Sequence, residues 1–474
     1  MPGKSGRTRL LDIALRRQMR RQAAAKTVAG ASTFLRKVIF PASTRIFGRS
    51  YFRGNTMRYG HYRLLSLAAA IIGAITFSSP SAAWTYKLLY TFCKNGGTCL
   101  DGKNPVGGLL LDKHGNMYGT TTSGGAAGGG TVFEFSRATS TYNVLYDFCS
   151  KKNCDDGATP SSSLIMDKKG NLYGTTTNGG RTVGYSGWGE VFELVHSSND
   201  SAWTLKVLHG FGGGDGGHPY FGALTYAGAN TGALYDGKST LYGTTSGYPA
   251  GTQSVFSLAR VNNVWTLTTI YNAEDFGGVI FDSAGNLYGT SQEGGDCEGG
   301  GGWVYELSPG ISWTPTVLHS FGCENDSGGP KDTLLLDSHG NLWGTTYGQP
   351  DPTCYAGDCG TVFELTPNGS TWTYQFPPIY LQPDGIAAPT AGLIEAPNGN
   401  LYGTASGSAS IYEVVPGVGL NVLWTASCGT LKKCRTGTNP VAPLIVDKTG
   451  RLFGVMSSGG DRDSSAGTIF ELVP

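Results

Sequence analysis

The sequence contains few charged residues and no stretch with the periodicity of an amphipathic helix. Asp, Glu, Lys and Arg together make up 15% of its 474 residues. Apolar residues do not recur at the three- and four-residue spacing that marks one face of a helix. The chain also lacks a Gly-x-Ser-x-Gly elbow, a His-Glu-x-x-His pair and, in a suitable context, a Gly-x-x-x-x-Gly-Lys loop. We therefore expect an all-β protein without the common hydrolase, zinc-protease or nucleotide-binding sites.

Long apolar runs are scarce as well, with one exception near the N-terminus. The 14-residue run 64–77 is too short to span a bilayer comfortably. Arginines precede this run, and small residues follow it as far as Ala83. Residues 57–83 therefore have the three parts of a secretory signal peptide, with a predicted cut before Trp84.

The charges are distributed unevenly along the chain. Residues 1–63 carry 15 Lys and Arg and a single acidic residue, whereas residues 64–474 carry 20 basic and 33 acidic residues. We interpret residues 1–56 as an Arg-rich extension ahead of a true start at Met57, with a long leader or an uncleaved anchor as the alternatives. The acidic remainder predicts no basic patch and no nucleic-acid partner.

Cysteine is infrequent, and all ten copies follow the predicted signal peptide. No pair has the Cys-x-x-Cys spacing or the neighbouring histidine expected of zinc ligands. An even number of cysteines in an exported chain instead predicts disulfides. The predicted pairs are Cys93 with Cys99, Cys149 with Cys154, Cys354 with Cys359, Cys428 with Cys434 and, as the two left over, Cys297 with Cys323.

Glycine, by contrast, is abundant, at 74 residues, and it recurs within repeated phrases. The phrase Leu-Tyr-Gly-Thr has its aromatic residue at Tyr118, Tyr173, Tyr242, Tyr288, Trp343, Tyr402 and Phe453. The phrase Val-Phe-Glu-Leu has its aromatic residue at Phe133, Phe192, Phe256, Tyr305, Phe363, Tyr412 and Phe470. Two phrases that alternate seven times indicate a tandem repeat over residues 84–474.

Each repeat is predicted to form four short strands. An apolar run that ends in an Asp-x-x-Gly turn comes first, the two phrases supply the second and third strands, and an alternating Trp-Thr segment supplies the fourth. Four-stranded units of about 55 residues are typical of propeller blades, so we predict a seven-bladed β-propeller, with an open solenoid as the poorer alternative. The chain begins with a fourth-type strand and ends on a third-type strand, and strand 84–92 is therefore predicted to close the last blade.

The two phrases resemble the GloVer tandem repeat of exported bacterial choice-of-anchor proteins. The resemblance covers residues 84–474 and implies a propeller without an assigned chemistry. The chain departs from that pattern at its end, because no C-terminal sorting or membrane segment precedes Pro474. We therefore do not expect surface anchoring by such a segment, nor a membrane span in the mature chain.

Two sets of recurring carboxylates could have a functional or a structural role. Catalytic carboxylates need distinct environments, whereas equivalent copies favour the same hydrogen bonds in every blade. The recurring Asp is expected to cap its turn rather than to bind calcium, because each turn offers too few oxygens. We predict no metal and no cofactor. The recurring Glu residues are Glu134, Glu193, Glu306, Glu364, Glu413 and Glu471, and the recurring Asp residues are Asp112, Asp167, Asp282, Asp337 and Asp447.

A unique site is expected where the repeats differ, on the face that carries the long loops from second to third and from fourth to first strand. The loop 212–220 is the most unusual of these, because it contains Asp215 and His218. Aromatic side chains on this face could bind sugars or cationic groups, or could simply pack their own loops. The ligand-binding candidates are Tyr185, Trp188, His218, Tyr220, Tyr248 and Tyr355.

Two functions from different classes follow from this pattern. The favoured one is a secreted or periplasmic, non-enzymatic binding or scaffold module of the bacterial envelope. It would act as a monomer on an envelope polymer, a carbohydrate or a protein. The alternative is an exported lyase or hydrolase in which His218 works with Asp215 or Glu298 as acid and base.

Overall fold

The described part of the chain lies in the compact unit Pro80–Pro474 of a computed structural model. The structure describes residues 84–474 apart from 95–96, 181–186, 198–201, 221, 248–252, 273–276, 293, 296–300, 311, 323–327, 348–359, 376–377, 382–384, 428–433 and 461–465. No helix within these described residues is long and apolar enough to cross a membrane.

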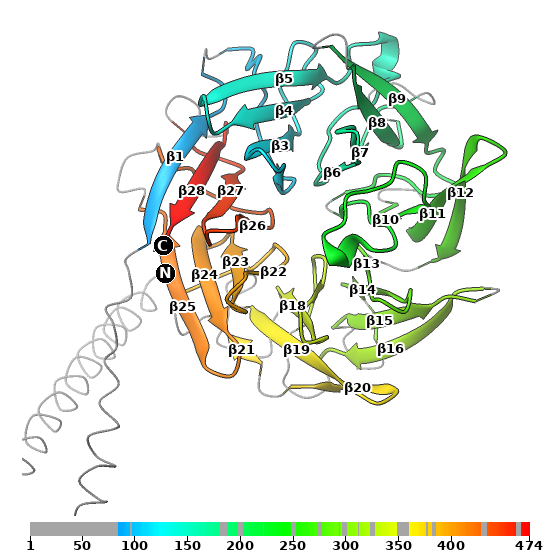
Figure 1. The fold of residues 1–474 in the computed structure, drawn as a ribbon, viewed down its shortest axis with the longest axis vertical. Helices are drawn as coiled ribbons and strands as arrows, with labels where there is room; N and C mark the ends of the chain where they lie inside the picture. The colour runs from blue at the N-terminus through cyan, green and yellow to red at the C-terminus, as the bar shows by residue number, and fades with distance from the viewer. Residues whose placement is uncertain are drawn as a thin grey trace, which may run out of the picture. The chain divides into compact units, whose positions relative to one another are not determined.

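Seven antiparallel sheets surround a common axis and form the blades of a propeller (Figure 1). Blade 1 contains β2 (Leu110–Leu111), β3 (Asn116–Thr121), β4 (Thr131–Ser136) and β5 (Thr141–Asp147). Blade 2 contains β6 (Ile165–Met166), β7 (Leu172–Thr176), β8 (Glu190–His196) and β9 (Trp203–Gly210). Blade 3 contains β10 (Leu241–Thr245), β11 (Ser254–Val261) and β12 (Val264–Tyr271). Blade 4 contains β13 (Ile280–Phe281), β14 (Leu287–Ser291), β15 (Trp303–Ser308) and β16 (Thr314–Ser320).

The remaining blades complete the ring, and the prediction of a seven-bladed propeller is confirmed. Blade 5 contains β17 (Leu335–Leu336), β18 (Leu342–Thr346), β19 (Thr361–Asn368), β20 (Thr371–Tyr374) and β21 (Ile379–Tyr380). Blade 6 contains β22 (Ile394–Glu395), β23 (Leu401–Ala405), β24 (Ser410–Val415) and β25 (Gly419–Thr425). Blade 7 contains β26 (Ile445–Val446), β27 (Leu452–Met456), β28 (Thr468–Val473) and, as its outer strand, β1 (Thr85–Thr91).

Strand β1 joins the first described residues to the last. It pairs antiparallel with β28, from Thr85 opposite Val473 to Thr91 opposite Thr468 (Figure 1). Its side chains enter two cores, because Tyr90 packs between blades 7 and 1 while Tyr86 stacks on Trp424 of blade 6 with ring centroids 4.2 Å apart. Blade 7 is therefore built from both ends of the propeller domain.

The glycine of the Leu-Tyr-Gly-Thr phrase makes room for an aromatic ring of the same blade. A Cβ atom placed on Gly174 would lie 2.9 Å from Cζ of Phe192 and 2.8 Å from Cδ2 of Leu164, which is closer than packed side chains allow. The equivalent glycine of every blade faces the aromatic residue of the Val-Phe-Glu-Leu phrase in the same way. The two phrases therefore form one packing unit.

The threonine that follows this glycine joins neighbouring blades. Thr120 of blade 1 donates its hydroxyl to the carbonyl of Ser162 of blade 2 at 3.2 Å, and Thr244 of blade 3 donates to Gly277 of blade 4 at 2.7 Å. Thr290, Thr345 and Thr404 make the equivalent bond to the next blade. A buried hydrogen bond of this kind contributes about 1 kcal/mol, and leaving its acceptor unpaired costs more.

A third repeated phrase, Xaa-Pro, lies at the start of the inner segment in every blade except blade 4, and it was not predicted from the sequence. Its first residue has a positive φ and donates its backbone N–H to the preceding blade, as Thr159 does to the carbonyl of Gly129 at 2.7 Å. The proline then covers a glycine of that blade, since a Cβ on Gly130 would lie 2.7 Å from Cδ of Pro160. The phrase occurs as Asn104-Pro105, Thr159-Pro160, His218-Pro219, Gly329-Pro330, Ala388-Pro389 and Asn439-Pro440.

Two blades depart from the predicted four strands. In blade 3 the first strand is reduced to an isolated bridge between Thr225 and Tyr242, because residues 226–240 leave the blade as an insertion. Tyr235 of this insertion pairs with blade 2 and packs edge-on against Tyr173, with ring centroids 5.1 Å apart. In blade 5 the outer strand is divided, so that β20 and β21 each pair with a different part of β19.

One buried carboxylate joins blades 5 and 6. Asp332 accepts the backbone N–H groups of Thr333 and of Gly392, each at 2.6 Å. Burial raises the pKa of Asp332 from 3.8 to about 6, although the two N–H donors lower it. The folded protein therefore holds this proton more tightly than the unfolded chain does.

We expect Asp332 to make stability pH-dependent. Because its folded pKa is raised, its contribution is most favourable below about pH 4 and is lost as the pH rises to about 6. Blade 2 has a serine, Ser162, at the equivalent position, so Asp332→Ser is a matched substitution. Between about pH 4 and 6, the free energy of unfolding measured in urea should fall less for this variant than for the wild type. Parallel pH profiles of the two proteins would contradict this assignment.

We also expect the stability of the propeller to depend on strand β1. Deleting residues 84–92 removes the outer strand of blade 7 and uncovers two cores, which should cost about 5 kcal/mol or more, comparable to the whole stability of many domains. Deleting residues 1–83 should leave the thermal midpoint nearly unchanged. Equal effects of the two deletions in thermal unfolding would show that β1 does not close the ring.

Candidate functional site

The described residues of the predicted site on the long-loop face are packed against their own loops. Trp188 lies between two turns of the loop 212–220, since Cβ atoms placed on Gly213 and Gly217 would lie 2.8 Å from its ring. Its ring also contacts that of His218, with centroids 5.1 Å apart. Tyr220 is partly exposed at the end of this loop. For Trp188 and His218 this packing is the structural alternative that the sequence left open, and ligand binding by the candidate residues stays a prediction.

The structure does not pair His218 with Asp215. The carboxylate of Asp215 bonds to Nε2 of His209 at 2.9 Å and to the backbone N–H of Gly212 at 2.8 Å. Nδ1 of His218 lies 2.9 Å from the carbonyl oxygen of Thr177, to which it donates. His218 also occupies the Xaa-Pro position described above, so its place is set by the joint between blades 2 and 3. The predicted acid–base pair is therefore not formed.

The other predicted residues of this face lie outside the described residues. They are Tyr185, Tyr248, Tyr355 and Glu298. The cysteines Cys297, Cys323, Cys354, Cys359 and Cys428 also lie there. Cys434 is disulfide-bonded, while its predicted partner is among these cysteines.

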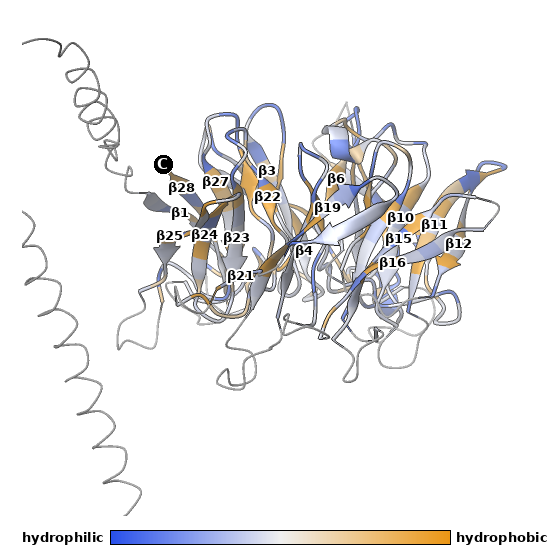
Figure 2. Ribbon diagram, turned by 90° about the horizontal axis from the view of Figure 1, so that it is seen from below, coloured by the Kyte–Doolittle hydropathy of each residue, from blue (hydrophilic) through white to orange (hydrophobic). Residues whose placement is uncertain are grey.

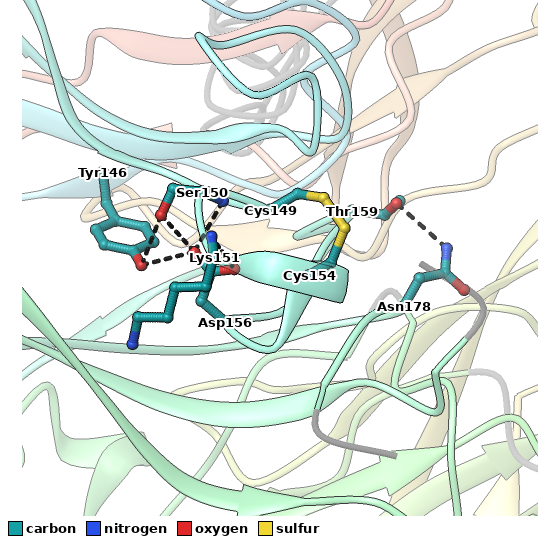
Figure 3. The surroundings of a disulfide bond; sticks show 8 residues. All are labelled: Tyr146, Cys149, Ser150, Lys151, Cys154, Asp156, Thr159 and Asn178. Carbon is teal, nitrogen blue, oxygen red and sulfur yellow. Dashed lines mark hydrogen bonds between the residues drawn. A yellow bond between two sulfur atoms is a disulfide. The ribbon is translucent and has the colours of Figure 1, made fainter. Parts of the chain in front are cut away.

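Two of the predicted disulfides are confirmed, Cys93 with Cys99 and Cys149 with Cys154. The second closes the loop that leads from blade 1 to blade 2 (Figure 3). Buried Asp156 holds the same loop, because it accepts the Tyr146 hydroxyl at 2.8 Å and the Ser150 hydroxyl at 2.6 Å. The loops on this face are thus stiffened by covalent and polar contacts together.

The recurring carboxylates have the structural roles that the sequence predicted. Asp167 accepts the backbone N–H groups of Lys169 and Asn171 and so caps its turn. Glu193 accepts the hydroxyl of Tyr173 at 3.1 Å, as Glu134 and Glu413 do with Tyr118 and Tyr402 at 3.0 and 2.9 Å. Within the described residues, no group of three or more His, Cys, Asp or Glu side chains could hold a metal ion.

On the opposite face, which carries the short turns, an aromatic contact recurs between neighbouring blades. At three junctions, a Trp at or just before the start of a fourth strand packs edge-on against the Tyr of the Leu-Tyr-Gly-Thr phrase in the preceding blade. The pairs are Trp84 with Tyr402, Trp313 with Tyr242 and Trp372 with Tyr288, with ring centroids 5.9, 5.9 and 5.6 Å apart. Figure 2 shows hydrophilic turns along the upper rim of the propeller.

The junction between blades 1 and 2 departs from this rule. Trp203 should contact Tyr118, but its ring lies against that of His196 instead, with centroids 4.7 Å apart. A cleft of about 1100 Å³ opens between the two blades. Tyr118, Trp203 and His196 line it, together with the turns 112–116 and 167–170 and with Asn143 on β5.

Burial raises the pKa of Tyr118 in this cleft, and the charges of Glu134 and Asp112 raise it further. The phenol therefore stays protonated and donates its hydrogen to Glu134. Lys113, Lys168 and Lys169 project from the two turns as exposed residues. The cleft thus combines aromatic rings, a fixed hydroxyl, a histidine and three ammonium groups, which suits binding of a polar ligand better than acid–base catalysis.

This cleft was not predicted from the sequence, although one position of the repeat differs between the blades on its side of the ring and the others. The residue four positions after the aromatic residue of the Val-Phe-Glu-Leu phrase is Pro in blades 4 to 7, at Pro309, Pro367, Pro416 and Pro474. It is Arg137, His196 and Arg260 in blades 1 to 3. His196 lies opposite Trp203 across β8 and β9, and the two rings are in contact.

Another sequence match has no functional counterpart. Residues 232–239 fit the letters of a Gly-x-x-x-x-Gly-Lys-Ser phosphate loop. Such a loop needs a preceding strand and a following helix, whose N-terminus faces the phosphate. Here the segment lies in the blade 3 insertion, and strand β10 follows it. We therefore assign it no nucleotide.

Comparison with known proteins supports the repeat and the fold. The profile of the Gloeobacter/Verrucomicrobia repeat matches residues 71–237 and 229–415. No curated protein matches the sequence. Similar solved structures include virginiamycin B lyase from Staphylococcus aureus, with 10% identity, a TM-score of 0.50 and coverage of 82% of this chain and 99% of that one. A streptogramin B lyase has 10% identity, a TM-score of 0.51 and coverage of 82% and 97%. A fungal alcohol oxidase in complex with copper has 11% identity, a TM-score of 0.50 and coverage of 82% and 75%. At such identities the likeness concerns the fold alone.

We expect His218→Asn to be tolerated. Asn104 and Asn439 occupy the same position with φ of 57° and 61°, close to the 50° of His218. The variant should change the free energy of unfolding by only about 1 kcal/mol, because it loses one side-chain bond and a ring contact. Urea unfolding measures this change. A loss of several kcal/mol would show that the imidazole, and not the backbone position, holds the joint.

Proposed function

This chain belongs to the Gloeobacter/Verrucomicrobia repeat family, and from that premise we propose that it is an exported binding module that holds a glycan in the cleft between blades 1 and 2. The supporting observation is the break in the aromatic rule at this junction. Three other junctions hold a Trp–Tyr contact, whereas Tyr118 and Trp203 both line an open cleft here.

The walls of the cleft favour a carbohydrate. Sugars present apolar ring faces edged by hydroxyl groups, which match an aromatic wall beside fixed donors and acceptors. Trp203 and His196 supply the rings, while Asn143 and the amide and carboxylate groups of the turns supply the polar contacts. The carboxylates of Asp112 and Asp167 also cap these turns, and Glu134 accepts the Tyr118 hydroxyl, so these bonds hold the walls rigid.

The disulfides support export. Close cysteine pairs persist in oxidising compartments and are rare in the cytosol. The two confirmed pairs lie in loops that follow the outer strands of blades 7 and 1. We therefore propose that the protein works outside the cytoplasm, in the envelope or the medium.

The proposal is tested by blocking the cleft without removing any of its bonds. Asn143 is exposed on β5 and lines the cleft, so Asn143→Trp should obstruct it. The full-length protein is screened against cell-wall polysaccharides by affinity electrophoresis. We expect retardation by at least one polymer, and we expect Asn143→Trp and Trp203→Ala each to abolish it.

Asn421 provides the matched control. It faces Glu413 in blade 6 as Asn143 faces Glu134 in blade 1, but it lies away from the cleft. Asn421→Trp should therefore bind like the wild type. If Asn143→Trp and Asn421→Trp both bind the polymer like the wild type, the cleft is not the glycan-binding site. If no polysaccharide retards the wild-type protein, the glycan-binding function is wrong.

A further inference from the structure

The Asp-x-x-Gly turns divide the turn face into a basic and a neutral part. The two central residues are Lys113-His114 in blade 1, Lys168-Lys169 in blade 2 and Lys448-Thr449 in blade 7. They are Ser283-Ala284 in blade 4 and Ser338-His339 in blade 5, while blade 6 has Pro397-Asn398. Three adjacent blades thus carry lysines in a position where the three blades across the ring carry none.

These lysines are available to a ligand. Lys113, Lys169 and Lys448 are exposed and form no ion pair with any residue that the structure describes. Lys168 is also exposed; its charge, after the hydrogen bonds from Ser239, helps to lower the pKa of Asp236 to about 2. We name Lys113, Lys168, Lys169 and Lys448 the lysine arc.

The arginines beside the arc, unlike these lysines, form ion pairs with residues that the structure describes. Arg137 of blade 1 bonds to Asp447 at 3.2 Å and to Glu471 at 3.3 Å, both in blade 7. Arg451 bonds to Glu471 at 3.0 Å. These pairs neutralise the carboxylates next to Lys448, which forms no ion pair within the described part of the chain.

The arc is continuous with the cleft. Lys113, Lys168 and Lys169 line the cleft between blades 1 and 2. His114 lines both this cleft and a hollow of about 400 Å³ toward blade 7, whose walls include Arg137 and Arg451. A path bordered by basic side chains therefore leads from Trp203 across blade 1 to the turn of Lys448.

The arc corrects the expectation that the acidic repeat region has no basic patch. Residues 64–474 have 33 acidic and 20 basic residues, yet the basic ones in these three turns share one part of one face. Ammonium groups at the ends of flexible side chains attract anions over a distance set by the ionic strength. A lysine in the same turn position of adjacent blades suits an extended ligand with repeated negative charges.

We propose that the cleft and the lysine arc together bind an acidic polysaccharide, whose sugar rings lie against Trp203 and His196 and whose anionic groups meet the arc. This inference rests on the glycan-binding function proposed above and adds the charge of the ligand and its path across blades 2, 1 and 7. Carboxylate and sulfate groups could both meet the lysines. Nucleic acid fits less well, because the aromatic wall is confined to one junction.

The test compares polymers and matched variants of the full-length protein. Polygalacturonate and dextran sulfate are the acidic probes, and dextran, the uncharged parent of the second, is the control. Lys168→Ser/Lys169→Ala converts the blade 2 turn to the sequence of blade 4, so the fold should tolerate it. Lys151→Ser/Lys152→Ala removes the same charge from exposed residues of the opposite face.

We expect at least one acidic polymer to bind more tightly than dextran, with an affinity that falls as salt is added. Lys168→Ser/Lys169→Ala should weaken this binding about tenfold at low salt, since each surface ion pair contributes modestly. Lys151→Ser/Lys152→Ala should leave it unchanged. Preference for polygalacturonate or for dextran sulfate identifies the anionic group.

Three results would overturn the inference. Equal weakening by the two lysine variants would indicate non-specific attraction. Duplex DNA that binds as tightly as the acidic glycans, with the same dependence on Lys168 and Lys169, would change the class of ligand. Equal binding of dextran and the acidic polymers, still blocked by Asn143→Trp, would remove the charge requirement but leave the proposed glycan-binding function intact.

Discussion

The structure depends on the joint between neighbouring blades. At five of the seven joints a threonine hydroxyl donates to the carbonyl of the next blade, as Thr120 does. At five joints an Xaa-Pro step seats a proline on a glycine of the preceding blade, as Pro160 does on Gly130. These groups are buried, so an unpaired carbonyl or an added Cβ would be costly. Substitutions at the buried residues of the joint are therefore disfavoured. Sequence differences between blades are tolerated in the loops, the turns and the outer aromatic residues.

This constraint explains how much could be predicted. The strand order and the number of blades follow from phrases that the joint requires in every copy, and the roles of Glu134 and Asp167 follow because equivalent residues make equivalent bonds. The Xaa-Pro phrase was present in the sequence but was obscured by its variable first residue. His218 was singled out for that reason, since a histidine at this position looks unusual until its equivalence to Asn104 and Asn439 is seen.

The cleft could not be predicted in the same way. It depends on how the rings of Trp203 and His196 pack beside Tyr118, which is a matter of side-chain packing and not of either phrase alone. The lysine arc is visible in the sequence as single residues, but only the ring places blade 7 beside blade 1 and thus joins Lys448 to Lys113. Ring closure places turns that are distant in the sequence side by side. Differences among nearly equal copies therefore make one part of the turn face chemically different from the rest.

The central claim is that the break in the aromatic contact between blades 1 and 2 is the binding site. The most direct measurement is a crystal structure of the protein soaked with an acidic oligosaccharide. We predict sugar density between Tyr118 and Trp203, with an anionic group near Lys113 or Lys169. Density confined to the long-loop face around Trp188, with an empty cleft, would contradict the account.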